Sequence, residues 1–360
     1  MVKLYGMKNG SILLKQFANV DAVLLKNGDN CFYLTEYANS DSYVLLTQKA
    51  CYYLTDDRYF TEACGLLSGG YEVVKVSPSS VLTVIKNILG GDGVKRLGFE
   101  DRSITYRDYT RYAEAFDGIS LTGTEETLLK IRAVKTDAEA ALIRKAAEIN
   151  DKSFGELLSK VREGVTEQEL KYELEYLLHK NGADGIAFDI ISAFGTATAN
   201  PHAHPTDRKL VKGMPVTLDF GCKYKGYCSD ITRTFFFGTP SEEFKKIYRA
   251  VLNANENALD AVSAGRDCAF VDKVARETLK ACGLAEYFTH GTGHGVGICI
   301  HESPVLNPSS EDVLAENMVV TVEPGVYIAG LGGVRVEDMA LVTSDGVKVL
   351  SKTDKKLTII

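Results

Sequence analysis

Four carboxylates and one imidazole, all on short β-like segments in the last third of the chain, form the pattern with the clearest chemical meaning. They are Asp219 in LDFG, Asp230 in SDIT, His294 in HGTGHGVG, Glu323 in VEPG and Glu337 in RVED. Carboxylate oxygens and imidazole nitrogens suit divalent metals of hard to borderline character. The pattern therefore predicts a hydrolase with a two-metal centre.

The spacing of the first two acids predicts that they form a pair across a hairpin. Residues that face each other in an antiparallel hairpin have numbers with a constant sum, and side chains alternate between the two faces. A two-residue loop at Tyr224 and Lys225 would set Asp219 directly opposite Asp230, with Cβ atoms roughly 5 Å apart. A bulge would shift this register by a step.

The other two acids predict a second pair of the same kind. The segment VVTVEPGVYIAGLGGVRVEDMALV folds back near Gly330, which would set Glu323 opposite Glu337. Like charges in this position destabilise a sheet, and burying unpaired carboxylates costs more. Two divalent cations would neutralise four carboxylates, and such ions lie about 3.5–4 Å apart. The alternative is that these acids lie on the solvent faces of ordinary hairpins.

The blocks around these residues resemble the signature blocks of the pita-bread metallopeptidases, specifically the Xaa-Pro aminopeptidase and Xaa-Pro dipeptidase (prolidase) branch. The blocks are LDFG…SDITRTF, HGTGHGVGICIHESP, TVEPGVY and GVRVEDMALVT. The resemblance continues upstream through PHAHPTDRKL to about Leu128, and more weakly through the N-terminal part. It implies hydrolysis of the bond between an N-terminal residue and proline in di- or oligopeptides.

The resemblance also implies a role for each metal ligand. Asp219 would chelate one ion, Asp230 and Glu337 would bridge both, and His294 with Glu323 would hold the other. A hydroxide between the ions would be the nucleophile, with Glu323 as general base, because a divalent ion lowers the pKa of bound water from 15.7 to about 7 in favourable cases. Carboxylate-rich sites suit manganese, which is the expected metal, with cobalt or zinc as alternatives.

Three further histidines and one arginine complete the predicted site. In the resemblance, His202 and His301 line the substrate pocket, bind the scissile peptide and help proton transfer, with Arg335 nearby. His290 lies near the loop of the metal-binding histidine. There it would either contact substrate or only hydrogen-bond with the groups around the ligands.

Two other functions share parts of this pattern. A methionine aminopeptidase has the same five ligands, but this chain adds a full N-terminal domain and the form HGxGHGxGxxxHE. A non-catalytic peptide-binding module of the same fold, or a creatinase-like metal-free hydrolase, would be expected to lack acidic ligands, and none is lost here. The glycine-rich stretch HGTGHGVG does not match a phosphate-binding motif.

The composition is that of an ordinary globular protein of about two domains, with 360 residues, 45% of them apolar and 25% charged. The net charge of −7 argues against nucleic-acid or anionic-membrane partners. Neither a run of about 20 apolar residues nor a signal segment is present, and the eight cysteines form no CxxC pair. We expect a cytoplasmic protein with reduced thiols, and the resemblance adds a homodimer.

The predicted elements divide the chain into two domains. Residues 1–124 alternate β segments, including CFYLT at 31–35, with amphipathic helices, which predicts an α/β domain with a mixed sheet. It resembles the creatinase/prolidase N-terminal domain. Residues 125–360 begin with helices at about 125–150 and 151–160, and a capping box at Thr166 and Glu169 starts a third. The order helices, hairpin, helices, hairpin fits an α+β pita-bread domain, a curved antiparallel sheet backed by helices with pseudo-twofold symmetry.

Overall fold

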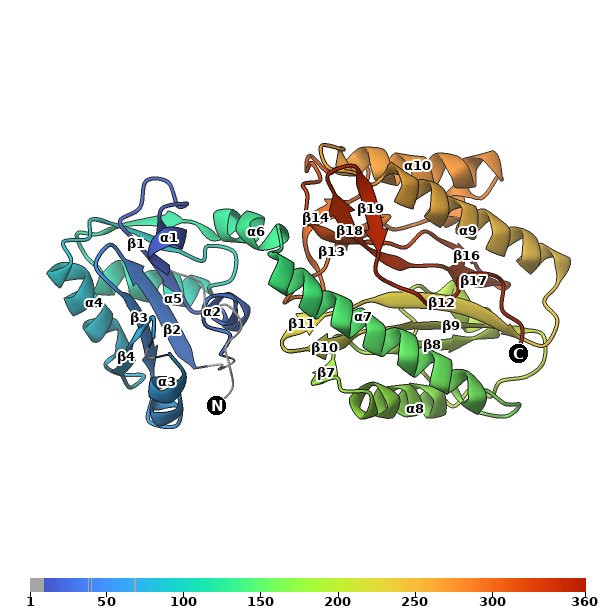
Figure 1. The fold of residues 1–360 in the computed structure, drawn as a ribbon, viewed down its shortest axis with the longest axis horizontal. Coiled ribbons are helices and arrows are strands. Elements are labelled where there is room, and N and C mark those ends of the chain that lie inside the picture. The colour runs from blue at the N-terminus through green and yellow to red at the C-terminus, as the bar shows by residue number, and fades with distance from the viewer. Residues whose placement is uncertain (1–9, 38, 40, 68) are drawn as a thin grey trace. The chain divides into compact units, whose positions relative to one another are not determined.

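The computed structural model describes residues 10–360 apart from residues 38, 40 and 68 (Figure 1). The chain divides into two compact units, of which the first ends at Arg132 and the second spans Ala133–Ile360. The division lies near the end of the helix Glu125–Ala133 (α6). The domain boundary between residues 124 and 125 stays a prediction. Within the described residues, none of the helices combines the length and apolar character needed to cross a membrane.

The first unit is the expected α/β domain with a mixed sheet. Its six strands lie in the order β4-β3-β2-β1-β5-β6, with β1–β2 and β2–β3 antiparallel and the other pairs parallel. The strands are Ala22–Leu25 (β1), Ser42–Thr47 (β2), Cys51–Thr55 (β3), Glu72–Lys75 (β4), Arg96–Phe99 (β5) and Ser120–Gly123 (β6). The helices are Gly10–Leu14 (α1), Gly28–Thr35 (α2), Phe60–Leu67 (α3), Val81–Gly91 (α4) and Tyr106–Ala115 (α5).

The predicted strand at residues 31–35 is wrong, because these residues form the second half of α2. The Asn27 side chain caps this helix by accepting hydrogen bonds from the backbone N–H groups of Asp29 and Asn30. Glu36 adopts a left-handed conformation and ends it. The aromatic and apolar residues that suggested a strand instead supply the buried face of a short helix.

The second unit begins with two helices, Asp137–Leu157 (α7) and Glu167–Lys180 (α8). The predicted break near residue 150 is absent, since α7 runs through it. The chain leaves the helix instead at residues 134–136, where a capping box formed by Thr136 and Glu139 starts α7. The predicted capping box of Thr166 and Glu169 is confirmed at the start of α8.

The strands of the second unit form two antiparallel sheets, with smaller pairings beside them. One sheet has the order β12-β9-β8 and the other β14-β13-β15-β18-β19, while β11-β10-β7 and β16-β17 form smaller sheets. The strands of the first half are Gly185–Ile186 (β7), Ile191–Phe194 (β8), Met214–Phe220 (β9), Cys222–Tyr224 (β10), Tyr227–Cys228 (β11) and Ile231–Phe237 (β12). Those of the second half are Gly293–Gly295 (β13), Glu302–Leu306 (β14), Val319–Val322 (β15), Gly325–Ile328 (β16), Gly332–Arg335 (β17), Asp338–Thr343 (β18) and Gly346–Val349 (β19).

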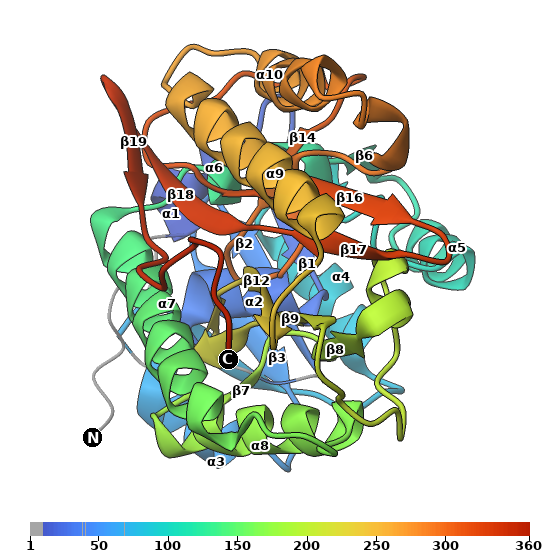
Figure 2. The same cartoon turned by 90° about the vertical axis from the view of Figure 1, so that its right-hand side faces the viewer.

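Helices cover the strands from two sides. The second pair, Glu242–Ala261 (α9) and Cys268–Ala281 (α10), lies on the side opposite to α7 and α8 (Figures 1 and 2). Neighbouring residues of β12 contact helices on opposite faces of the strand. Phe235 packs against Phe154 of α7, while Phe236 packs against Phe244 of α9. Both faces of the strand are therefore buried, and the expected strands backed by helices, in a twice-repeated order, are confirmed.

The first hairpin turns one residue later than predicted. Tyr224 pairs with Tyr227, so the turn residues are Lys225 and Gly226, both with positive φ (48° and 81°), as a tight two-residue hairpin requires. Asp219 consequently pairs with Thr232 and is not directly opposite Asp230. Because Asp230 lies two residues before Thr232, both acids still lie on the same face of the hairpin.

The second hairpin has the predicted register. Val322 pairs with Asp338, and Gly325 pairs with Arg335, so the residue numbers of each pair have the same sum. Glu323 and Glu337 lie between these two paired stretches, opposite each other. The backbone leaves regular pairing at this point, and Glu323 N–H donates instead to Thr292 O, while Glu337 N–H donates to Thr232 O.

Candidate active site

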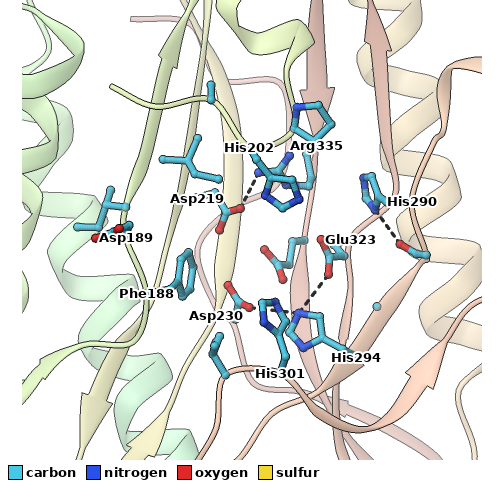
Figure 3. Close-up of a pocket in the computed structure, with 18 of the residues that line it drawn as sticks. Phe188, Asp189, His202, Asp219, Asp230, His290, His294, His301, Glu323 and Arg335 are labelled. Carbon is cyan, nitrogen blue, oxygen red and sulfur yellow. Dashed lines mark hydrogen bonds and ion pairs between the residues drawn. The ribbon is translucent and has the colours of Figure 1, made fainter. Parts of the chain in front are cut away.

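A cavity of about 600 Å³ in the second unit brings all the predicted site residues together (Figure 3). Its walls include residues from both sheets and from the loops that precede β9, β13 and β14. The predicted residues that line it are Asp219, Asp230, His294, Glu323, Glu337, His202, His290, His301 and Arg335. Residues chosen by type and spacing in the sequence therefore all lie around one cavity of the structure.

Each candidate ligand lies in a strand or directly beside one, which limits its movement. Asp219 is in β9, and His294 is in β13. Asp230 precedes β12, Glu323 follows β15, and Glu337 precedes β18. β9 and β13 are each paired with a strand on both sides, which fixes the backbone of Asp219 and His294. The labelled carboxylates point into the cavity (Figure 3).

His294 lies between two carboxylates. Its Nε2 is 3.5 Å from Asp230 Oδ2 and 3.3 Å from Glu323 Oε1, and its Nδ1 is 3.1 Å from the carbonyl oxygen of Gly295. Nδ1 therefore donates to the carbonyl, which leaves Nε2 facing the two acids. A bare lone pair there would be repelled by both, so this geometry requires either a proton on Nε2 or a cation between the groups.

The glycines around His294 allow this close arrangement. A Cβ atom on Gly293 would collide with the carbonyl oxygen of Thr321, and one on Gly295 would collide with that of Ser303. Only glycine lets the neighbouring backbones approach so closely.

Burial and neighbouring carboxylates raise the pKa values of two acids of the cavity. Burial raises the pKa of Asp230 well above its usual value, and the charges of Glu337 and Asp219 raise it further. Burial, followed by the charge of Glu323, does the same to Glu337. Although burial opposes ionisation of Glu323, the hydrogen bond from His294 lowers its pKa to about 2. The protein alone therefore does not neutralise this cluster.

Arg335 supplies the one guanidinium among the residues that line the cavity. Its Nη2 donates to Asp219 Oδ2 at 2.6 Å, and its Nη1 donates to the hydroxyl of Tyr327 at 2.8 Å. The Tyr327 hydroxyl lies 2.8 Å from His290 Nε2, and His290 Nδ1 lies 2.8 Å from Gly291 O. Since Tyr327 accepts from Arg335, it donates to His290, which is then neutral and protonated on Nδ1.

Tyr327 belongs to this hydrogen-bond chain but was not among the residues predicted from the sequence. It follows Glu323 by four residues in the block TVEPGVYI, and burial raises its pKa to about 12. A tyrosine beside glycines and a predicted ligand was the available signal. Phe188 and Asp189, which line the cavity, had no comparable signal (Figure 3).

The two predicted substrate histidines come from different loops. The His301 ring packs edge-on against the His294 ring at 4.4 Å between centroids, and burial followed by the charge of His294 lowers its pKa. His202 is exposed, and it lies in a segment whose two ends are bound by one carboxylate, because Glu167 accepts from the backbone N–H of Phe194 and of Thr206. Glu167 therefore fixes the loop that carries His202.

Comparison with known proteins identifies the family. The model of metallopeptidase family M24 matches residues 141–344, which is more than half of the chain. The chain belongs to metallopeptidase family M24. The creatinase/prolidase N-terminal domain matches residues 15–134 of this M24 peptidase. The predicted combination of an N-terminal α/β domain with a pita-bread domain is confirmed.

Relatives of this M24 peptidase include proteins with both expected activities. It is 40% identical over 261 residues to an Xaa-Pro dipeptidase of Pyrococcus furiosus, covering 72% of this chain and 75% of the relative. Among solved structures, an Xaa-Pro dipeptidase from Bacillus anthracis has 39% identity and a TM-score of 0.94, covering 98% and 99% of the two chains. An X-Pro aminopeptidase from Thermotoga maritima has 32% identity and a TM-score of 0.90, covering 97% and 99%.

The M24 family implies a divalent metal, and the residues of the cavity suit one. Donor atoms of Asp230, His294 and Glu337 all lie within 4.8 Å of one another. Oδ1 of Asp219 and Oδ1 of Asp230 are buried and have no hydrogen-bond partner among the described residues. Buried carboxylate oxygens without donors are costly, and a cation would satisfy them.

Replacing Tyr327 with phenylalanine tests the hydrogen-bond chain of this M24 peptidase. The change leaves Arg335 Nη1 and His290 Nε2 buried without that partner, and it barely alters side-chain volume. The free energy of unfolding, measured by urea denaturation, is expected to fall by about 1–3 kcal/mol. An unchanged value would mean that other groups satisfy both atoms.

Proposed function

We propose that this chain hydrolyses the bond between an N-terminal residue and proline, using two divalent ions bound by Asp219, Asp230, His294, Glu323 and Glu337. The observation that carries the proposal is the cluster of four carboxylates around one imidazole in a cavity of about 600 Å³. The names of the Pyrococcus, Bacillus and Thermotoga relatives support the choice of proline peptides. Manganese is the proposed metal, with cobalt or zinc as alternatives.

Bound divalent ions would lower the pKa of a water molecule and polarise the scissile carbonyl. The chain's own residues then have separate tasks. Glu323, whose pKa is lowered to about 2, is ionised at neutral pH. Its Oε1 accepts from the Thr321 hydroxyl and faces His294 Nε2, so its other oxygen is the one that can accept a proton. His301 and His202 bind the scissile peptide from two sides of the cavity. Arg335 supplies positive charge and keeps Asp219 in place.

Recognition of proline fits the nature of this cavity. The bond before proline is a tertiary amide, so its nitrogen has no N–H for the enzyme to bind. A site for it must recognise the shape of the ring. Apolar side chains of Phe188, Ile190, Ile300 and Val305 line the cavity beside the histidines and offer such a surface.

One experiment tests the proposed activity and separates its variants. Metal-stripped protein is reloaded with manganese and given an Xaa-Pro dipeptide, an Xaa-Pro-Xaa tripeptide and a Met-Ala peptide, with product release measured for each. We expect manganese-dependent turnover of at least one proline peptide. Preference for the dipeptide would define a prolidase, and preference for the tripeptide an aminopeptidase.

Two outcomes would contradict the proposal. Turnover of Met-Ala alone would indicate a methionine aminopeptidase, and no metal-dependent turnover of any peptide would indicate a peptide-binding module. Reloading with cobalt or zinc in parallel, with metal content measured after dialysis, distinguishes a wrong metal from an inactive protein. The bridging hydroxide, the homodimer, the cytoplasmic location and the absence of nucleic-acid and membrane partners stay predictions, and light scattering tests the homodimer.

A further inference from the structure

A buried ion pair lies next to the loop that carries His301. Lys135 Nζ is 2.8 Å from Glu302 Oε1, and the two side chains expose only 1% and 4% of their surface. The same ammonium group donates to the carbonyl oxygen of Ala133 at 3.1 Å. Neither residue lines the cavity, and neither belongs to the predicted site.

Glu302 contacts the loop between β13 and β14 at more than one place. It directly follows His301, and its backbone pairs with Gly295, the residue after His294. Its carboxylate also lies against Gly297, where a Cβ atom would collide with it. The Glu302 side chain therefore contacts the second residue of the loop, and Glu302 itself directly follows the last one, so its position constrains residues 296–301 from both ends.

Lys135 is itself held firmly by the backbone. Its N–H donates to Asn317 O at 2.9 Å, and the preceding residue, Val134, forms an antiparallel bridge with Met318. The next residue, Thr136, caps α7. Because residues 317 and 318 lead directly into β15, the lysine is fixed to the strand that precedes Glu323.

A buried ion pair contributes little net stability, since the cost of removing both charges from water offsets their attraction. Its effect is mainly on geometry, because two short, dry hydrogen bonds fix the orientation of the groups that make them. We propose that Lys135 is a positioning residue for the peptidase reaction. Through Glu302 it fixes residues 296–301 and holds the His301 ring against His294.

The kinetic test compares Lys135→Met with Lys180→Met. The control lysine forms an ion pair of the same length, 2.8 Å, with Glu156, but these two side chains expose 51% and 31% of their surface. At saturating manganese, Lys135→Met is expected to lower kcat/KM about 10–100-fold, as removal of groups that orient active-site ligands commonly does. Lys180→Met is expected to match the wild type. Wild-type kcat/KM in Lys135→Met would overturn the proposal.

A double-mutant cycle with His301→Ala shows whether the lysine acts through that histidine. If it does, Lys135→Met changes kcat/KM by less than about twofold when His301 is already absent, because the two losses are not additive. The same fold-loss in both backgrounds would overturn the proposal. This arm rests on the proposed function, since it requires turnover of a proline peptide.

A second variant keeps the test decisive if Lys135→Met does not fold. Lys135→Met combined with Glu302→Gln removes both charges, so no uncompensated charge stays buried. Faster amide hydrogen exchange in residues 296–302, with global stability retained, is expected for the double variant. Wild-type exchange there would overturn the proposal. Because this measurement needs no substrate, failure of the wild type to cleave any peptide would contradict only the proposed function.

Discussion

Replacing Glu337 with glutamine is expected to abolish peptidase activity while leaving the fold intact. Glu337 is fully buried between the strands of the second hairpin, where it accepts a hydrogen bond from the Thr232 hydroxyl at 2.7 Å. Glutamine has nearly the same shape but removes one of four negative charges in the proposed metal site. Metal ions supply several kcal/mol of transition-state stabilisation. Since each 1.36 kcal/mol is tenfold in rate, kcat/KM should fall at least about 1,000-fold.

The control for this variant is Glu243→Gln, the same chemical change at an exposed position of α9. It is expected to retain wild-type activity and metal content. Metal content of Glu337→Gln, measured after dialysis, should be lower than that of the control. Wild-type turnover by Glu337→Gln at saturating metal would contradict the proposed metal site, whereas loss of activity in both variants would indicate a nonspecific effect.

The metal-free protein is expected to lose stability as the pH rises from about 5 to 8. The pKa values of Asp230 and Glu337 are raised in the folded state, first by burial and then by neighbouring carboxylates. Between their unfolded and folded pKa values, the folded state binds more protons than the unfolded state, so stability falls as pH rises. The raised pKa of His294, which burial opposes but Glu323 sustains, acts in the same direction. Each proton is worth about 1.4 kcal/mol per pH unit.

Glu323 does not reverse this trend. Its pKa is lowered to about 2, so its contribution to stability is lost only as pH falls below the unfolded value and is constant above it. Urea denaturation with a chelator present, at several pH values, measures the slope. Rising stability between pH 5 and 8 would contradict the raised pKa values. Glu337→Gln serves as the internal control, because removing one titrating group should flatten the profile.

Manganese is expected to restore the stability lost at high pH. A ligand that binds only the folded state at a thousand times its dissociation constant adds about 4 kcal/mol. The increase should be larger at pH 8 than at pH 5.5, since protons compete for the same carboxylates. A metal effect that is equal at both pH values would mean that the ions bind groups that do not titrate in this range.

Much of the fold was predictable because its signals are local. The capping box of Thr166 and Glu169 starts α8 as the residues indicate, and alternation of side chains predicted that each hairpin carries two acids on one face. Residues 31–35, the second half of a helix, were mistaken for a strand, because the cap at Asn27 outweighed the β propensity of the residues after it. The break at Lys135 was also missed, since it depends on a hydrogen bond to Asn317, which is distant in sequence.

The sequence by itself determined which residues can do chemistry. Their types and the period of two along each strand identify the same five candidate ligands that the structure brings into one cavity. The tertiary structure decided the register of the first hairpin, in which Asp219 pairs with Thr232, because a turn one residue later was as compatible with the local pattern. It also determined that Tyr327 binds Arg335 and His290 and that Lys135 binds Glu302. Hydrogen bonds between distant segments produce no periodic pattern in the sequence that could have predicted them.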